Sequence, residues 1–432
     1  MERIEIRNFA GIKEVSLEVK QINILIGPQA SGKSIIAKLL FYFKNFIFEV
    51  ISAAKDLKYK RDLDKDYKLK FKEYFPSASW GNQSFVIKYY IDNEFVEVYR
   101  KKAKSSKQPS DIVLNYSKFY REGFAKLKNI VKKHNIELLE GEIQTTFFSR
   151  IRSSIDITTD LLEHISHGLH ENSTFSQLYI PAGRSFFANL RNSIFTFLSE
   201  NNTVDPFLTD FGTYYEKIKS PLTQGIFEEK IQEKEKLYDD INFLNEKILC
   251  GKYFQREGED YIRVDGNRRI AVANSSSGQQ ETLPLVLILR TLAIIKLSIN
   301  GSSVYIEEPE AHIFPAAQKS IVELISTIYN ARKDSLQFVI TTHSPYILTA
   351  LNNLLQAGIL ATDATEEKIE QISQHVPKSR FLTPQEVAVY SLENGYCKSI
   401  IDEETGLIDT NIIDEVSNEL AIQFDELLEL EE

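Results

Sequence analysis

The sequence predicts an α/β protein with a mostly parallel sheet flanked by helices, a β-rich N-terminal edge and an inserted helical region. Strand-like and helix-like segments alternate through residues 1–48 and 251–350, which is typical of parallel α/β folds. A glycine-rich turn at Gly27 joins an apolar strand to a helix. The apolar strands near residues 304 and 338 lack polar alternation, as expected for parallel strands that are buried on both faces.

The N-terminal lobe, residues 1–100, begins with alternating strands and an apolar strand at 22–26. An apolar helix is expected from Ser34 onward and charged helical sequence at 50–75. Residues 84–100 read as a β-hairpin around the turn IDNE.

The middle region, residues 101–250, is mostly helical in pattern and is expected to be an insertion, interrupted by a strand of the main domain near 177–187. Its last helix, which stops before Gly251, has apolar residues at helical spacing: Phe227, Ile231, Leu237, Ile241, Leu244 and Ile248.

The C-terminal lobe, residues 251–432, follows with two short strands and an apolar helix at 285–297. Buried strands are expected at 303–308 and 337–344, and alternating strands near 386–401. An acidic amphipathic helix is expected at the end of the lobe.

Composition limits the class of protein. The chain is 43% apolar and 26% charged, and it has no apolar run long enough to span a membrane. Its first residues lack the pattern of a signal peptide, so we expect a cytoplasmic protein without membrane contact. Cys250 and Cys397 are too few for a disulfide framework or a thiolate metal site. A net charge of −10 does not support broad nucleic-acid binding, although a local basic site stays open.

The stretch GPQASGKS matches the phosphate-binding pattern G-x-x-x-x-G-K-[ST], placed between a strand and a helix. Lys33 is expected to contact the β and γ phosphates of ATP, and Ser34 to ligate Mg²⁺. The alternative is a glycine-rich turn that only caps a helix. The residues expected to surround the nucleotide are Gly27, Pro28, Gln29, Ala30, Ser31, Gly32, Lys33, Ser34 and Ile35.

Two adjacent carboxylates, Glu307 and Glu308, follow an apolar strand, at the sheet edge where ligands of α/β folds bind. Neighbouring strand residues point to opposite faces. We therefore expect Glu307 to face the Mg²⁺ shell beside Ser34, and Glu308 to act as the general base. The next strand ends at His343, which is expected to sense the γ phosphate; the alternative for each is an ordinary polar strand end.

Small polar residues cluster at Asn274–Glu281, immediately before an apolar helix. Ser277 followed by Gln280 matches a capping box, which would start this helix without any ligand.

In this order, GPQASGKS, SSSGQQE, VYIEEPEAHIFP and ITTHSPYIL make the chain resemble the ABC-type ATPase heads of the SMC, Rad50 and OLD (overcoming lysogenization defect) group, and the OLD-like branch is the most similar. The resemblance makes Lys33 and Ser34 the Walker A pair and Glu307 and Glu308 the Walker B pair, with His343 as the switch histidine. It makes Glu310, Ala311 and His312 the D-loop.

The resemblance also implies that SSSGQ replaces the signature LSGGQ, so that Ser276 and Gly278 contact the γ phosphate held by a second copy. The chain departs from the family in its first Walker B acid and in its signature. Glu307 stands where many members have Asp, and the signature lacks its Leu and one Gly. Gln83 is the best candidate for the Q-loop glutamine.

A stand-alone ATPase of this branch resembles the ATPase subunits of two-gene anti-phage systems of the PARIS and Septu types, where another subunit carries the nuclease. The resemblance implies a slow, regulatory ATPase that oligomerises, controls a separate effector nuclease and responds to a phage-encoded trigger protein. Two alternatives stay open. A Rad50-like DNA-repair ATPase requires long heptad arms, which residues 111–250 lack. A self-contained nuclease has only the acidic turn at Asp402, Glu403 and Glu404 as a candidate site.

Three weaker patterns have two interpretations each. His164, His167 and His170 form either a zinc-binding face or a solvated helix end. The basic stretch 100–107 is either a plain charged loop or a contact for nucleic acid or an acidic protein. The last helix is expected to pack against its own head, with partner docking as the alternative, through Val416, Leu420, Phe424 and Leu427.

Overall fold

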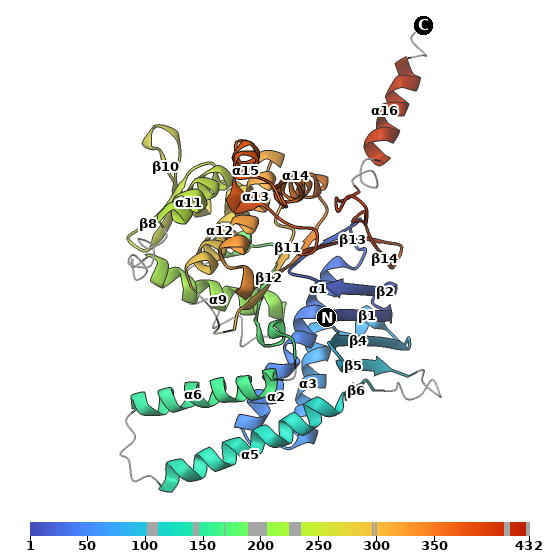
Figure 1. The fold of residues 1–432 in the computed structure, drawn as a ribbon, viewed down its shortest axis with the longest axis vertical. Helices are drawn as coiled ribbons and strands as arrows, with labels where there is room; N and C mark the ends of the chain where they lie inside the picture. Colours follow the sequence, from blue (N-terminus) through green and yellow to red (C-terminus); the bar gives the residue numbers. More distant parts are fainter. Residues whose placement is uncertain are drawn as a thin grey trace.

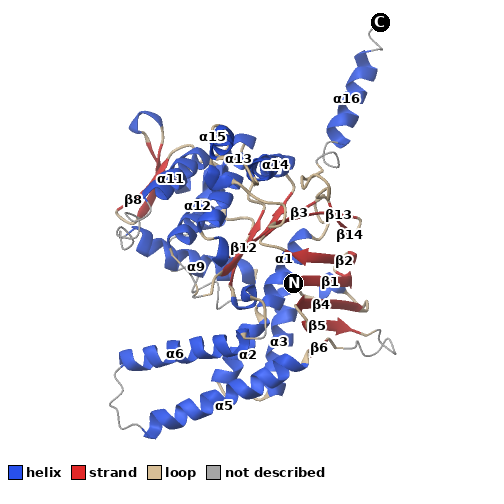
Figure 2. Ribbon diagram, viewed as in Figure 1, coloured by secondary structure: helices blue, strands red, loops and turns tan. Residues whose placement is uncertain are grey.

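The structure is a computed structural model that describes residues 1–101, 111–140, 147–167, 169–188, 205–223, 235–295, 298, 300–409 and 415–428. One large sheet runs through the molecule with helices on both of its faces (Figures 1 and 2). Its strand order is β6-β5-β4-β1-β2-β14-β13-β3-β12-β11-β7. The predicted α/β class, with a β-rich N-terminal edge and a parallel part, is confirmed.

The N-terminal edge of the sheet is antiparallel and consists of β1 (Glu2–Phe9), β2 (Ile12–Val19), β4 (Phe85–Ile91), β5 (Glu94–Arg100) and β6 (Val113–Tyr116). Ile4 pairs with Leu17 across β1 and β2, and both are buried, so the register places apolar side chains on one face. The hairpin expected at 84–100 is β4–β5. Strand β6 was not expected, because the four residues VLNY show no alternation of apolar and polar residues.

The other part of the sheet is parallel and holds β13 (Val387–Glu393), β3 (Ile22–Ile26), β12 (Leu336–Thr342), β11 (Ser302–Glu307) and β7 (Ser176–Ile180). Strands β3, β11 and β12 are buried along their whole lengths, which explains their continuous apolar sequences. Strand β14 (Tyr396–Ser399) joins the two parts, because it pairs with both β13 and β2. The residues that follow β3, β11 and β12 therefore share one edge of the sheet.

Two apolar cores lie on opposite faces of the sheet: Tyr305 belongs to the first, and its neighbours Val304 and Ile306 belong to the second. The helices with buried residues in the first core are α1 (Lys33–Lys44), α2 (Phe46–Lys55), α3 (Lys60–Tyr74), α4 (Ser77–Trp80), α5 (Lys118–Glu140), α6 (Phe147–Ser166) and, through Phe207, the start of α9 (Pro206–Thr223). Those of the second core are α7 (Ser185–Ala188), α9, α11 (Glu235–Leu249), α12 (Ser277–Ile294), α13 (Pro315–Ala331) and α14 (Pro345–Ala361). Helix α15 (Glu366–Ser373) packs against α14.

The helix expected before Gly251 is α11, and its residues Ile241, Leu244 and Ile248 are buried in the second core. Phe227 and Ile231 lie outside the described residues, as does most of the basic stretch 100–107. A small antiparallel sheet follows, with β8 (Lys252–Arg256), β9 (Glu259–Arg263) and β10 (Arg269–Ala271). The first two of its strands were expected from the sequence.

Two parts of the chain project from the body of the molecule. Helices α5 and α6 form an arm below it, and α16 (Glu415–Leu428) extends away from it at the opposite end (Figure 1). In α16 the side chains of Ile422, Phe424 and Leu427 are exposed. The expectation that this helix packs against its own head is therefore wrong for Phe424 and Leu427, and the side chains of Val416 and Leu420 lie outside the described residues. An amphipathic pattern predicts that a helix buries its apolar side, but it does not identify the surface that covers that side.

Within the described residues, no helix is long and apolar enough to cross a membrane.

Candidate active site

The glycine-rich turn expected to bind phosphate lies between β3 and α1, at the shared edge of the parallel strands. A side chain at Gly27 would collide with the carbonyl oxygen of Leu392 in β13. Gly32 has a φ of 100°, and a Cβ there would lie 2.9 Å from the side chain of Ile12 in β2. Strands β13 and β2 thus both approach the turn closely. The tip of the turn, residues 28–30, is exposed.

Helix α1 begins at Lys33, and Gly32 is its N-cap residue. No side chain caps this helix, and its first turn contains no acidic residue. The first N–H groups of a helix have no partner within the helix, and together with the helix dipole they attract anions. Ser34 and Ile35 are half-buried in this turn. The arrangement suits a phosphate group, as the sequence predicted.

The Lys33 side chain is buried and lies over the turn. Its Nζ donates to the carbonyl oxygens of Gly27 and Pro28, each at 2.7 Å, and to Oγ of Ser31 at 3.2 Å. Burial lowers the pKa of Lys33 to about 8, while the neighbouring carboxylates of Glu308 and Glu310 act in the opposite direction. The lysine is thus close to its pKa in neutral solution, and an added anion would favour its charged form.

The three residues expected to carry catalysis lie together. Nδ1 of His343 is 3.3 Å from Nζ of Lys33, and Nε2 of His343 is 3.4 Å from Oε1 of Glu308. One ring nitrogen of His343 thus faces the amine of Lys33 and the other faces the carboxylate of Glu308. About one third of each side chain is exposed, 33% for His343 and 38% for Glu308, so the pair is open to a ligand.

Glu307 points to the other face of β11 and is buried. Its Oε1 accepts from the hydroxyl of Tyr179 at 2.7 Å, and its Oε2 accepts from the backbone N–H of Ala182 at 3.2 Å. Burial and the Glu307 carboxylate raise the pKa of Tyr179 well above its ordinary value, so the hydroxyl stays a donor. Each carboxylate oxygen keeps a second lone pair, which can face a metal-bound water.

Glu310 orients the end of β12. Its Oε1 accepts from Oγ1 of Thr342 and from the backbone N–H of His343, both at 2.7 Å. His343 is thus fixed through its backbone by the segment that follows Glu308. The sequence assigned Glu310 to this segment but did not predict these contacts.

The predicted signature residues start helix α12. The capping box consists of Ser276 and Gln279 rather than Ser277 and Gln280, so the prediction was wrong by one residue. Ser277 has helical geometry and Ser276 has the extended geometry of an N-cap, a distinction that spacing alone cannot make between adjacent serines. A Cβ at Gly278 would lie 2.5 Å from the carbonyl oxygen of His312, so the start of α12 packs closely against the predicted D-loop segment of its own chain.

Arg184 was missed by sequence reasoning. It is fully buried, with 0% of its side chain exposed, and it donates to the carbonyl oxygens of both Glu307 and Glu308. Tyr179, which orients Glu307, was missed as well. Both residues lie in or just after β7, in the segment QLYIPAGRS, which resembled the family loosely; nothing in the sequence distinguishes this arginine from a surface one.

The remaining predicted residues lie elsewhere. His164, His167 and His170 are exposed at the end of α6 and after it. The part of the chain that the structure describes contains no group of three or more His, Cys, Asp or Glu suited to a metal ion.

Gln83 is exposed in the turn before β4, and β1, β2, β14 and β13 separate β4 from β3. Asp402 accepts from the backbone N–H and hydroxyl of Thr405 within an exposed turn.

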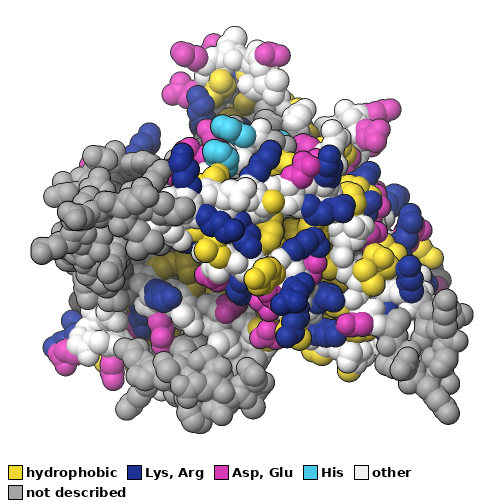
Figure 3. Space-filling view, turned by 90° about the horizontal axis from the view of Figure 1, so that it is seen from below, with side chains coloured by type: hydrophobic (Ala, Val, Ile, Leu, Met, Phe, Trp, Pro, Cys, Tyr) yellow, Lys and Arg dark blue, Asp and Glu magenta, His cyan; other side chains and the backbone are white. Residues whose placement is uncertain are grey.

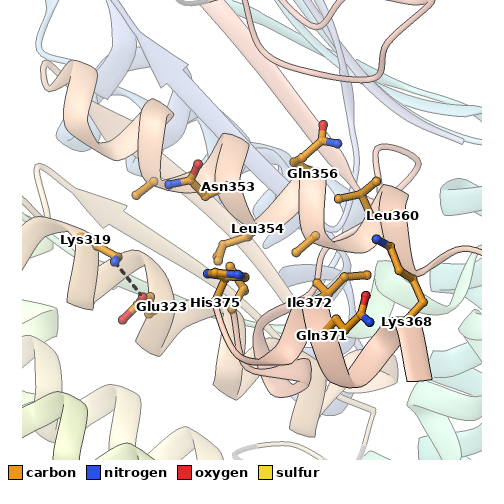
Figure 4. A pocket seen from close by; sticks show the side chains of 13 residues that line it. Lys319, Glu323, Asn353, Leu354, Gln356, Leu360, Lys368, Gln371, Ile372 and His375 are labelled. Atoms are coloured by element: carbon orange, nitrogen blue, oxygen red, sulfur yellow. Dashed lines mark ion pairs between the residues drawn. The ribbon is translucent and has the colours of Figure 1, made fainter. Parts of the chain in front are cut away.

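A cavity of about 530 Å³ lies between α13, α14 and α15 (Figure 4). Leu354 and Ile372 contribute apolar lining, Lys368 and the ion-paired Lys319 contribute charge, and His375 contributes a polar ring. None of its lining residues belongs to the phosphate-binding turn or to the Lys33, Glu308 and His343 cluster. We therefore place the candidate active site at the sheet edge.

The family model of the AAA ATPase domain matches residues 1–348. The chain belongs to the AAA ATPase domain family. Membership confirms the predicted class of enzyme, an ATPase, and nucleotide binding with it. The match includes the phosphate-binding turn, β11, β12 and His343, so this AAA ATPase domain contains the whole cluster described above.

Among curated proteins, this AAA ATPase resembles the "Retron Vc95 probable ATPase" of Vibrio cholerae serotype O1 biovar El Tor, with 30% identity over 100 residues. That match covers 22% of this chain and only 19% of the relative's length. Among solved structures, an SMC head bound to the C-winged helix domain of ScpA has 12% identity and a TM-score of 0.41, covering 92% of this chain and 96% of that one.

The SMC head domain of Thermotoga maritima has 11% identity and a TM-score of 0.35, covering 92% of this chain and 97% of that one.

Proposed function

We propose that this protein is an ATP-dependent switch of a bacterial anti-phage system, which oligomerises through shared ATP sites and controls a separate effector nuclease. The observation that carries the proposal is the convergence of Lys33, His343 and Glu308 beside an uncapped helix N-terminus. These are the parts that phosphoryl transfer to water requires: a phosphate cradle, a cation and a carboxylate that can orient the water.

Each residue has a role in this proposal. The first turn of α1 and Lys33 hold the β and γ phosphates, and Glu308 orients the attacking water. His343, which already faces both Lys33 and Glu308, senses the γ phosphate. Ser34 and Glu307 would hold a Mg²⁺ ion, which would supply positive charge to offset that of the phosphates. Mg²⁺ is usually held by one or two carboxylates together with substrate phosphates and water. A single carboxylate, that of Glu307, would therefore suffice here.

Sharing of ATP sites is proposed from the place of the signature residues. Ser276 and Gly278 lie at the N-terminus of α12, against the D-loop of their own chain. Among the described residues, neither makes a hydrogen bond with residues 27–35 of the same chain. A second copy that brings its own phosphate-binding turn to this helix start would complete the site, and ATP would then hold two copies together.

The role in defence is supported by the similarity to a retron's probable ATPase, in addition to the OLD-like motifs. The chain matches only 19% of that relative, so the effector nuclease and the phage-encoded trigger are proposals. Their test is co-purification of the protein with the products of neighbouring genes. Recovery of recombination proteins in place of a nuclease would contradict a defence role.

A mixing experiment tests the shared site. Lys33→Ala and Ser276→Ala are each expected to lose ATP turnover alone, and an equimolar mixture should regain part of it, because one of the mixed sites contains both wild-type residues. As a matched control we choose Lys20→Ala, since Lys20 also donates to two backbone carbonyl oxygens, those of Pro384 and Val387, but before β3. A mixture that stays inactive would contradict sharing, and unchanged turnover in Lys33→Ala would contradict the ATP site.

One observation favours a second function, nucleic-acid binding. Residues 58–72 hold seven Lys or Arg and three Asp, and residues 118–135 hold six Lys or Arg and one Glu, in a chain of net charge −10. On α3 the basic residues Arg61, Lys65, Lys68 and Lys72 follow helical spacing, opposite to the buried Leu63, Tyr67 and Phe71. Figure 3, the view from below, shows Lys and Arg side chains gathered across the middle of this face.

If such a face contacts the phosphates of a nucleic acid, its affinity for the nucleic acid should fall as the salt concentration rises. The test is fluorescence anisotropy with labelled duplex DNA, single-stranded DNA and RNA over a range of salt concentrations. Charge reversal at Lys65, Lys126 and Lys132, all exposed, should weaken binding and reduce its salt dependence. Reversal at the exposed Lys398 on β14 is the control. No binding at low salt, or binding unaffected by the triple reversal, would exclude this function.

A further inference from the structure

The guanidinium of Arg184 is the meeting point of three segments that are distant in sequence. Nη1 donates to the carbonyl oxygen of Glu307 at 2.6 Å, and Nη2 donates to that of Glu308 at 3.0 Å. Nε donates to the carbonyl oxygen of Glu281 in α12 at 3.1 Å, and Nη1 also donates to that of Pro181 at 2.9 Å. Its fixed fork of donors therefore spans two successive carbonyls at the end of β11.

A buried carboxylate holds this arginine in place. Oε1 of Glu281 lies 3.3 Å from Nη2 of Arg184, and the two side chains are 1% and 0% exposed. The same carboxylate accepts from the backbone N–H groups of Arg184 at 2.9 Å and Ser185 at 2.8 Å. Both charges are thus paired and hydrogen-bonded, which is the condition under which a buried ion pair persists.

The carbonyl groups that Arg184 holds belong to the turn that aims the proposed general base. Glu308 has a φ of 42°, in the left-handed region that non-glycine residues adopt only when their surroundings enforce it. The backbone N–H of Glu308 donates to Thr341 in the neighbouring strand at 2.9 Å. Its N–H is thus held by β12 and its carbonyl by Arg184, and from this fixed backbone the Glu308 side chain reaches His343.

We propose that Arg184 is a positioning residue of the active site, which sets the orientation of Glu308 and links it to the signature helix α12 through Glu281. Glu281 lies one helical turn after Gly278, so the start of α12 and the general base are joined by a single buried ion pair. This inference rests on the proposed ATPase site and adds a residue that touches neither nucleotide nor water. Its effect is on the chemical step and not on nucleotide binding.

The test compares Arg184→Lys with Glu308→Gln and with their double variant. Lysine keeps the charge beside Glu281 but cannot span both carbonyl groups. We expect Arg184→Lys to lower kcat by about 100-fold, the typical cost of misplacing a catalytic group by about 1 Å, with unchanged nucleotide affinity. The double variant should be no slower than Glu308→Gln alone, because both changes remove the same contribution.

Two further variants separate positioning from stability. Arg184→Met combined with Glu281→Met removes both buried charges together, which proteins tolerate better than the loss of one, and this variant should fold but remain slow. Arg380→Lys is the matched control: Arg380 is another buried arginine, paired with Asp240 of α11 and Glu323 of α13. It should lower Tm without lowering kcat.

A measurement independent of turnover accompanies these assays. Amide hydrogen exchange of residues 307–311 should accelerate in Arg184→Lys and in the Met pair, but not in Arg380→Lys. Wild-type exchange rates in both Arg184 variants would overturn the inference, as would a wild-type kcat in Arg184→Lys. It would also be overturned if the double variant with Glu308→Gln lost kcat by the product of the two single losses. If the wild-type protein shows no Lys33-dependent turnover, the proposed function fails, and the exchange data alone decide whether Arg184 holds the turn.

Discussion

His343 stands between Lys33 and Glu308, and its imidazole faces the carboxylate of Glu308 across 3.4 Å. The two residues come from neighbouring parallel strands, β12 and β11, and each follows a strand that is buried along its length. The contact therefore joins the residue that would sense the γ phosphate to the residue that would orient water. In the proposed mechanism, hydrolysis would therefore depend on the position of a single imidazole ring.

Glu308→Gln should stop hydrolysis while nucleotide binding survives. Removal of a general base typically lowers the rate by about 10²–10⁴-fold, and the amide keeps the size of the side chain. Single-turnover hydrolysis and a fluorescent-nucleotide titration measure the two effects separately. His343→Ala should also slow hydrolysis, whereas His375→Ala, in the cavity of Figure 4, serves as the control. Normal hydrolysis in Glu308→Gln would exclude its role as the base.

Nucleotide affinity should fall as the solution becomes more alkaline than the pKa of Lys33, about 8. Below that pH the free protein already carries the charged lysine, so binding of the triphosphate requires no proton there. Above it, Lys33 is neutral before binding and must take up a proton, which opposes association. Calorimetry at about pH 9, in buffers with different ionisation heats, should show this uptake. Lys33→Met should abolish it, and an affinity independent of pH would contradict the assignment.

Tyr179→Phe should impair Glu307. The change removes the donor of the 2.7 Å hydrogen bond and leaves a buried carboxylate oxygen with one partner fewer, at a cost of about 1–3 kcal/mol in unfolding free energy. If Glu307 faces the metal shell, the Mg²⁺ concentration that gives half-maximal turnover should rise as well. Tyr305→Phe is the matched control, because the Tyr305 hydroxyl bonds to Gln177 and not to Glu307. Equal Mg²⁺ dependence in both variants would remove Glu307 from the metal shell.

Deletion of residues 410–432 should leave Tm unchanged. The apolar side chains of α16 at Ile422, Phe424 and Leu427 are exposed, so their removal takes no apolar area out of the core. Leu289→Ala in α12 provides the comparison, since Leu289 is fully buried and a cavity there should cost about 2–5 kcal/mol. A large loss of stability on deletion would show that α16 packs on the chain after all.

Local patterns carried most of the fold prediction. Strand β1 could be read from its period of two, and β3, β11 and β12 from their continuous apolar runs, because burial on one or two faces leaves these different signatures. The four residues of β6 had no such signature. The sequence of α16 likewise could not show whether another surface covers its apolar side. The error of one residue at Ser276 has the same origin, because the backbone conformation that defines a helix N-cap depends on the surroundings.

The sequence by itself determined the composition of the candidate site: a phosphate-binding turn, two carboxylates and a histidine, each at the end of an apolar strand. Motif spacing suffices for this, since chain connectivity delivers Lys33, Glu308 and His343 to one sheet edge once the strands are parallel. Only the tertiary structure decided which residues hold these groups in place. Arg184 and Tyr179 contact residues that lie 97 to 128 positions away in the sequence. A local sequence pattern cannot indicate a partner at that separation.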